Sequence, residues 1–191
     1  MSADEIQRLY ESVKEESVKL EPSESNPEGA GIEEIEDFLK RYAKVLYPSH
    51  VLMIEKKYTL AKMYGRLKGY TVNELTDKQL TRKMNLCTEV LEMFDKTMPG
   101  RTRKRGMMMY ELHLPLLILA NKALQSGPNA QGGLSRGEIK RYLQRALENL
   151  KNGLDILGEE PEGSFEYQIV QGSKESLHQL EEYVKAVAKA L

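Results

Sequence analysis

Positively charged side chains at a turn are the first feature of this sequence with clear chemical potential. Arg101, Arg103, Lys104 and Arg105 follow a Pro-Gly turn and precede the most apolar segment of the chain. An arginine guanidinium presents a planar fork that pairs with carboxylate or phosphate groups. The run therefore predicts a partner-binding site for an acidic peptide or another anion. A solvated turn between two helices is the alternative, because short charge runs commonly serve that purpose.

Nucleophilic and metal-binding residue types are sparse. The sequence has one cysteine, Cys87, and three histidines, His50, His113 and His178. One cysteine forms no internal disulfide, and this set is too small for a multi-zinc module. Glu111 and His113 are two residues apart and would face different sides of a helix. We therefore predict no catalytic residue, no metal site and no cofactor.

The charge distribution is uneven although the net charge of the 191 residues is only −1. Residues 1–37 hold twelve acidic and three basic side chains, a net charge of −9, so the remaining 154 residues sum to +8. The near-neutral total argues against nucleic-acid binding through bulk neutralisation of phosphates. This asymmetry motivates the hypothesis that the acidic arm (residues 1–37) folds back over the basic body as an intramolecular mimic of an acidic partner; the sequence leaves open whether it does.

Segments that would direct the chain to a membrane are not recognisable. The N-terminus MSADEIQRLY lacks the basic region and apolar run of a signal peptide. The longest apolar stretch, Leu114 to Ala120, is far shorter than the roughly 20 residues that span a bilayer. We expect no membrane partner and a cytoplasmic or nuclear protein with a reduced thiol.

Helical periodicity and turn residues divide the chain into about seven expected helices. Residues 1–31 are predicted to form an acidic helix, up to about residue 20, and a Pro- and Gly-rich linker, and residues 32–191 the main helical domain. Capping boxes are expected at Thr71-x-x-Glu74, Thr76-x-x-Gln79 and Ser135-x-x-Glu138. Ser49 is the expected cap of the third helix. The fold class is all-α. The recurring helix pairs favour an antiparallel tetratricopeptide-like bundle, but the consensus of that repeat is absent, so periodicity alone also fits an irregular bundle.

The most apolar expected helix covers about residues 105–124 and should lie at the centre of the domain. It contains three successive methionines, Met107 to Met109, which we interpret as core residues rather than as an adaptable binding surface. His113 is expected to be a hydrogen-bonded core histidine packed near Tyr110. Cys87 shares a face with neighbouring apolar residues, so we expect a buried and unreactive thiol.

Several unusual strings in this region resemble a known family. They are YPSHVLMIEKKYTLAKMYGRLKGYTVNELTDKQLTRKMNLCTEVLEMFDKTMPG and RGMMMYELHLPLLILA. They are similar, in the same order and with similar spacing, to the C-terminal helical domain of SET and MYND domain-containing proteins, above all those of arthropods. The resemblance continues through LENLKNGLDILGEEPEGSFE and covers about residues 33–185.

The sequence also departs from this family. Family enzymes place a SET domain, a zinc-binding MYND insert and a cysteine-rich segment before the helical domain, whereas Cys87 is the only thiol here. No catalytic or cofactor motif of those enzymes is recognisable. The resemblance therefore implies the helical domain without the S-adenosylmethionine-dependent lysine methyltransferase. An excised fragment, a truncated product and a stand-alone paralogue are all compatible with it.

The family resemblance implies a tetratricopeptide-like bundle that packs beside catalytic lobes and binds partner peptides, including the acidic C-terminal tail of a heat-shock chaperone. On this basis Lys56, Lys57 and Lys62 are candidates for a basic peptide groove on the third helix. The alternative is an exposed helix face, because these lysines do not form one narrow stripe.

The sequence thus predicts a non-catalytic protein-interaction domain that binds an acidic peptide or a catalytic lobe. Two alternatives remain open. In one, the chain is part of a protein-lysine methyltransferase whose SET domain is missing from it; in the other, it is a purely structural helical bundle.

Overall fold

The computed structural model describes residues 2–23, 29–127 and 133–191. Within these residues it contains seven α-helices and no strand, apart from an isolated bridge between Gly65 and Thr71. The all-α prediction is therefore confirmed. Tetratricopeptide-like character, which rests on the recurring helix pairs and on the family resemblance, stays a prediction.

Contacts along the chain define two compact units, Met1–Asn73 and Glu74–Leu191. The domain boundary predicted from the sequence lies earlier, between residues 31 and 32. That position lies just before the second helix of the first unit, and residues 24–28 of the predicted linker are outside the described residues. The two units are described separately below.

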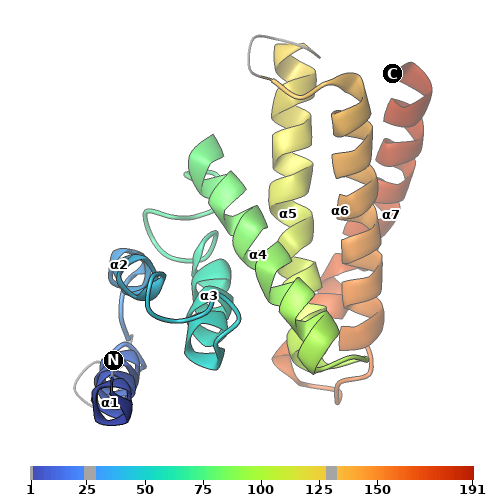
Figure 1. Ribbon diagram of the computed structural model, residues 1–191. Helices are drawn as coiled ribbons and strands as arrows, with labels where there is room; N and C mark the ends of the chain where they lie inside the picture. Colours follow the sequence, from blue (N-terminus) through green and yellow to red (C-terminus); the bar gives the residue numbers. More distant parts are fainter. Residues whose placement is uncertain (1, 24–28, 128–132) are drawn as a thin grey trace. The chain divides into compact units, whose positions relative to one another are not determined.

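The first unit contains α1 (Ala3–Lys19), α2 (Ile32–Tyr42) and α3 (Val51–Met63) (Figure 1). α2 is short but strongly amphipathic, and it buries five of its eleven residues: Ile32, Ile35, Phe38, Leu39 and Tyr42. α1 buries only Val13 and Ser17. At the start of α3, the ring nitrogen Nδ1 of His50 accepts a hydrogen bond from the Leu52 amide. The predicted cap Ser49 is thus wrong by one residue.

The second unit contains α4 (Asp77–Thr97), α5 (Arg103–Ser126), α6 (Arg136–Leu157) and α7 (Phe165–Ala190). Each helix runs antiparallel to the one before it (Figure 1). α5 packs most extensively on α6, because two glycines, Gly106 and Gly153, allow the backbones to approach closely. The apolar α5 is central, as predicted: α4 packs on it as well as α6, and Met107 and Met108 are buried.

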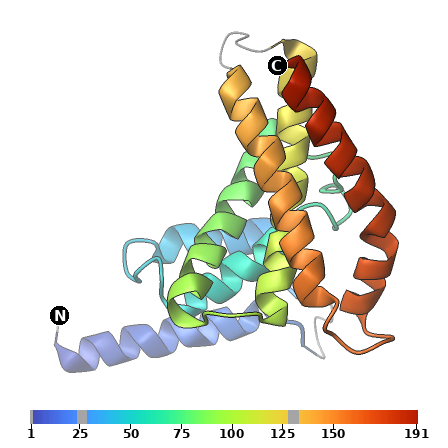
Figure 2. The ribbon, with the colours of Figure 1, turned by 90° about the vertical axis from the view of Figure 1, so that its right-hand side faces the viewer.

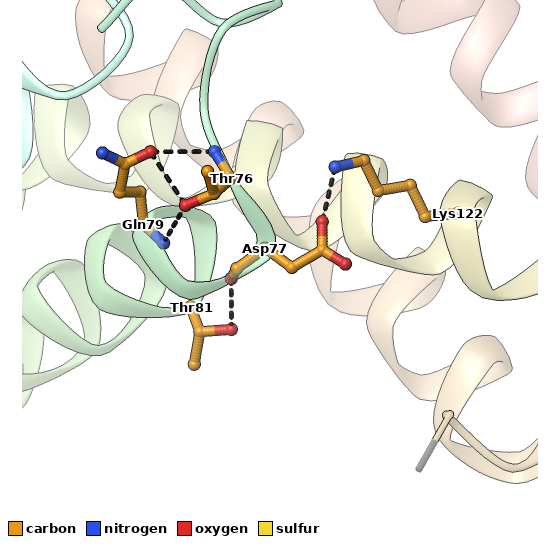
Figure 3. Close-up of polar contacts among 5 residues, drawn as sticks. All are labelled: Thr76, Asp77, Gln79, Thr81 and Lys122. Carbon is orange, nitrogen blue, oxygen red and sulfur yellow. Dashed lines mark hydrogen bonds and ion pairs between the residues drawn. The ribbon is translucent and has the colours of Figure 1, made fainter. Parts of the chain in front are cut away.

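Local hydrogen bonds fix where these helices begin. At the start of α4, the Thr76 hydroxyl accepts from the Gln79 amide, and the Gln79 side chain accepts from the Thr76 amide (Figure 3). Ser135 and Glu138 form the same capping box at α6. These two predictions are confirmed. Hydrogen bonds from Ser135 lower the pKa of the Glu138 carboxyl below its usual range.

The capping box expected at Thr71-x-x-Glu74 is wrong, because no helix begins there and the chain forms a turn. The Gly65 amide donates to the Tyr70 carbonyl at 2.8 Å, and Thr71 forms the isolated bridge with Gly65. Gly65 has a φ of 97°, in the left-handed region that glycine adopts at little cost. This backbone pairing competes with helix initiation and determines the local structure.

Candidate protein-interaction site

The predicted basic run lies at the start of α5, where most of its positive charge is matched by acidic residues of the same unit. Arg101 Nη1 lies 2.8 Å from Asp155 Oδ2, and Arg101 Nη2 lies 2.9 Å from Glu159 Oε1. The hydrogen bonds to Asp155 and then Glu159 raise the pKa of the Arg101 guanidinium. An acidic ligand at this position would therefore have to compete with both carboxylates.

The rest of the run shows the same pattern. Arg105 pairs with Asp95, and Arg103 lies 3.8 Å from Glu166. Lys104 is exposed and forms no ion pair with any described residue. The partner-binding role of the run stays a prediction. Its charge is nevertheless largely compensated, which directs attention to cations that have no acidic partner.

The predicted lysines of α3 lie in the first unit and are mostly enclosed. Lys56 is 2% exposed and pairs with Glu21, while Lys57 is 7% exposed and donates to the Pro48 carbonyl at 3.1 Å. Lys62 is half-buried, with its ammonium 5.3 Å from the centre of the Tyr58 ring. The first two lysines therefore stabilise the unit from inside, and their role in partner binding stays a prediction.

Part of the acidic arm contacts basic residues of its own unit. Glu16 of α1 lies 2.5 Å from Arg41 of α2 and also accepts a hydrogen bond from the Tyr42 hydroxyl, which raises the pKa of that phenol. Glu21 pairs with Lys56, as described above. Two glutamates thus fasten the C-terminal end of α1 and the residues just after it to α2 and α3.

An ion pair lies in the interior of the second unit. Lys83 Nζ of α4 is 2.6 Å from Glu111 Oε2 of α5, and the two side chains are only 1% and 6% exposed.

His113 is close in sequence: its Nδ1 contacts the Tyr110 carbonyl, and its ring centre is 5.0 Å from that of Tyr110. Desolvation lowers the pKa of the partly buried His113 imidazole. Its predicted packing is confirmed.

Cys87 is fully buried, as predicted, and desolvation raises the pKa of its thiol to about 12. At pH 8 only about one molecule in 10,000 would carry the reactive thiolate, even before burial blocks access. We therefore expect Ellman's reagent to label the native protein at least about 1,000-fold more slowly than the protein unfolded in guanidinium. Rapid stoichiometric labelling of the native protein would contradict the buried position.

A groove with uncompensated positive charge runs along one side of α6 and α7. Its first hollow has a volume of about 370 Å³ and a largely apolar floor that includes Leu143, Leu147 and Val184. Lys140 of α6 and Lys185 of α7 lie on its edges. Figure 2 shows these two helices side by side over much of their length.

A second hollow of about 390 Å³ lies further along the same two helices, with Leu154, Val170 and Leu177 among its lining residues. Apart from Asn152, the α6 residues of both hollows recur every three or four positions and so share one helix face: 140, 143, 144, 147, 151, 154 and 155. We call the two hollows together the α6–α7 groove. At 1.5 Å per residue its α6 side is about 22 Å long.

Four lysines line the α6–α7 groove: Lys140, Lys151, Lys174 and Lys185. Lys185 pairs with Glu182 at 2.8 Å, but both side chains remain mostly exposed. Across the described part of the chain, the other three lysines form no ion pair. Two acidic residues also line the groove, Glu181 and Asp155, and the latter is already paired with Arg101. The groove therefore combines an apolar floor with a net positive rim.

Sequence reasoning missed this groove. Lys140 and Lys151 lie eleven residues apart beside the leucine stripe of α6, and Lys174 and Lys185 have the same spacing in α7. Because eleven residues are close to three helical turns, this spacing places the two lysines of each pair on the same face of their helix, which the sequence alone indicates. The pairing of the two stripes across one groove depends on the register of α7 against α6, which the sequence does not state.

Among the residues whose placement is described, no cluster of His, Cys, Asp or Glu has the geometry of a metal site. Likewise, none of the described helices has the length and apolarity to cross a membrane. Comparison of the chain with protein-family models, curated proteins and solved structures found no match.

Proposed function

We propose that this chain is a non-catalytic protein-interaction domain and that its α6–α7 groove binds an acidic segment of a partner protein. The observation that carries the proposal is the coincidence, along the same groove, of an apolar floor and three lysines without acidic partners. Membership of the SET and MYND domain-containing family, with its chaperone-tail ligand, is a further proposal that rests on the sequence resemblance alone. Cytoplasmic or nuclear residence is also proposed from the sequence.

The division of roles within the groove follows from the energies of the two kinds of contact. An exposed ion pair contributes only about 0.2–1 kcal/mol, so four lysines alone would bind weakly and without much selectivity. Apolar area removed from water contributes about 25 cal/mol per Å². The floor would therefore supply most of the affinity, while the lysines would select an acidic partner and accelerate its association.

The interior of the second unit supports an interaction role over a catalytic one. A general acid or base must lie within hydrogen-bonding reach of its substrate. Lys83 and Glu111 are enclosed and paired with each other, and the Cys87 thiol is fully buried and protonated. These titratable groups are therefore placed to stabilise the bundle rather than to contact a ligand.

A peptide titration tests the proposal directly. The probe is a fluorescent amphipathic peptide of about 18 residues, long enough to span the groove, with leucines on one face flanked by glutamates. We expect fluorescence anisotropy to show saturable binding. Changing Lys140 and Lys151 together to Glu should weaken it at least about tenfold, because two attractions become repulsions.

Matched variants make the result specific to the groove. Lys78→Glu/Lys189→Glu carries the same charge change on exposed lysines of the second unit that do not line the groove, and should bind the probe as the wild type does. A probe with lysines in place of the glutamates should not bind. Equal loss of affinity in both double variants, or no binding of the acidic probe, would contradict the proposal and favour a purely structural bundle.

A further inference from the structure

The N-terminal half of α1 presents an apolar face that its own unit does not cover. Ile6, Leu9, Tyr10 and Val13 follow helical spacing and share one side of α1. Val13 is fully buried, but Ile6 is 53% exposed and Tyr10 is 39% exposed. Figure 2 shows the N-terminal end of α1 extending beyond α2 and α3. The same stripe is thus packed at one end and open at the other.

This open part, Ala3 to Glu11, is acidic. It carries Asp4, Glu5 and Glu11 against a single base, Arg8, for a net charge of −2. It is also firmly helical from its start, because Ser2 and Glu5 form a complete capping box. We call this segment the α1 overhang. It is a preformed acidic amphipathic helix about 13 Å long.

We propose that the α1 overhang of one copy of the chain occupies the α6–α7 groove of a second copy. This inference rests on the proposed function of the groove, because it names the acidic segment that the groove binds. The overhang offers Ile6 and Leu9 to an apolar floor and carboxylates to a rim of lysines. At about 13 Å the overhang would cover a little more than half of the roughly 22 Å α6 side of the groove. The two surfaces complement each other in polarity and charge.

The C-terminal half of α1 is anchored to the first unit, so the overhang stays attached to that unit while it binds the groove of a second copy. Glu16 holds α1 to Arg41 and Tyr42 of α2, so the C-terminal half of the helix stays in place. The overhang therefore docks without unfolding anything, and a second copy supplies it without any rearrangement inside either unit. Reciprocal exchange gives a closed two-fold dimer with two equal contacts. Because each contact is small, we expect a dimer that dissociates in the micromolar range.

Complementation between two variants tests this dimer. Ile6→Lys removes the apolar contact of the overhang and adds a repulsive charge, while the groove stays intact. Lys140→Glu/Lys185→Glu reverses the groove, while the overhang stays intact. By analytical ultracentrifugation, the wild type should be dimeric at about 100 μM and each variant alone monomeric. An equimolar mixture of the two variants should recover a heterodimer, since one intact overhang meets one intact groove.

The control for the overhang is Val18→Lys, which makes the same change at a 62% exposed apolar position of the same helix. Val18 lies roughly 120° around α1 from Ile6, away from the stripe, so this variant should remain dimeric. Circular dichroism should show unchanged helix content in all variants, because the substituted side chains are at the surface. A wild type that is monomeric would overturn the inference. A mixture of the two variants that stays monomeric would also overturn it, and that result is expected if the overhang binds the groove of its own chain.

The acidic probe peptide separates failure of this inference from failure of the proposed function. In the Ile6→Lys variant no overhang competes for the groove, so the probe should bind it more tightly than it binds the wild type at about 100 μM protein. Probe binding of equal strength to both proteins, without a dimer, would overturn the α1 proposal and leave the groove as a partner site. If the Ile6→Lys variant binds no probe either, both proposals are wrong.

Discussion

Replacing Lys83 by methionine is expected to lower the free energy of unfolding by about 3–5 kcal/mol. Lys83 and Glu111 approach to 2.6 Å with both side chains almost fully buried, and they join α4 to α5. Methionine fills much of the space of the lysine stem but carries no charge. The Glu111 carboxylate would then remain in the interior without the ammonium that matches it, which is far more costly than the loss of the pair itself.

Double and control variants separate this cost from simple loss of contact. Lys83→Met/Glu111→Leu removes both charges, so it should be more stable than Lys83→Met alone, although each variant loses the pair. Lys185→Met breaks an ion pair whose side chains are 66% and 61% exposed, and it should cost less than about 1 kcal/mol. Urea unfolding followed by circular dichroism measures all three. A Lys83→Met loss as small as that of Lys185→Met would contradict the burial of the pair.

Features that depend on a few neighbouring residues could be predicted from the sequence. The capping boxes at Thr76 and Ser135 were predicted because each hydroxyl and its return side chain lie three residues apart, whatever surrounds them. The box at Thr71 has the same letters and is wrong, since the backbone of Gly65 pairs with that segment instead. A local pattern thus gives the right structure only where no other backbone pairing forms in the same segment.

Features that depend on distant residues could not be predicted. Lys83 lies three residues after Leu80 and four before Cys87, so its phase alone places it on the buried face of α4. Its ion-pair partner Glu111 is 28 residues away and is identified only by the packing of α4 on α5. The basic run at Arg101 shows the same limit, because its matching acids, Asp155 and Glu159, come from more than 50 residues further along the chain.

Adding one methyl group at Gly153 is expected to destabilise the protein by about 1–3 kcal/mol, the cost of overpacking a close contact. A Cβ at this position of α6 would lie 3.0 Å from the Gly106 carbonyl oxygen and 3.0 Å from the Tyr110 nitrogen, both of the α5 backbone. A flexible side chain can move away from such a contact, but helix backbone cannot move without displacing its own hydrogen bonds. Gly153→Ala therefore requires α5 and α6 to separate along the most extensive helix pair of the second unit.

Gly172 of α7 is the matched control, since a Cβ there meets no atom within 4 Å. Gly172→Ala should stabilise the protein by about 0.5–1 kcal/mol, because alanine has less conformational freedom to lose in a helix than glycine. The same chemical change thus has opposite expected signs in α6 and α7, which thermal unfolding resolves as shifts of about 2–4 °C per kcal/mol. If Gly153→Ala were neutral or stabilising, α5 and α6 would be further apart than described.

The position of α6 bears on function as well, because its opposite edge carries the lysines of the α6–α7 groove. Gly153→Ala should therefore weaken binding of the acidic probe as well as stability, whereas Gly172→Ala should change stability alone.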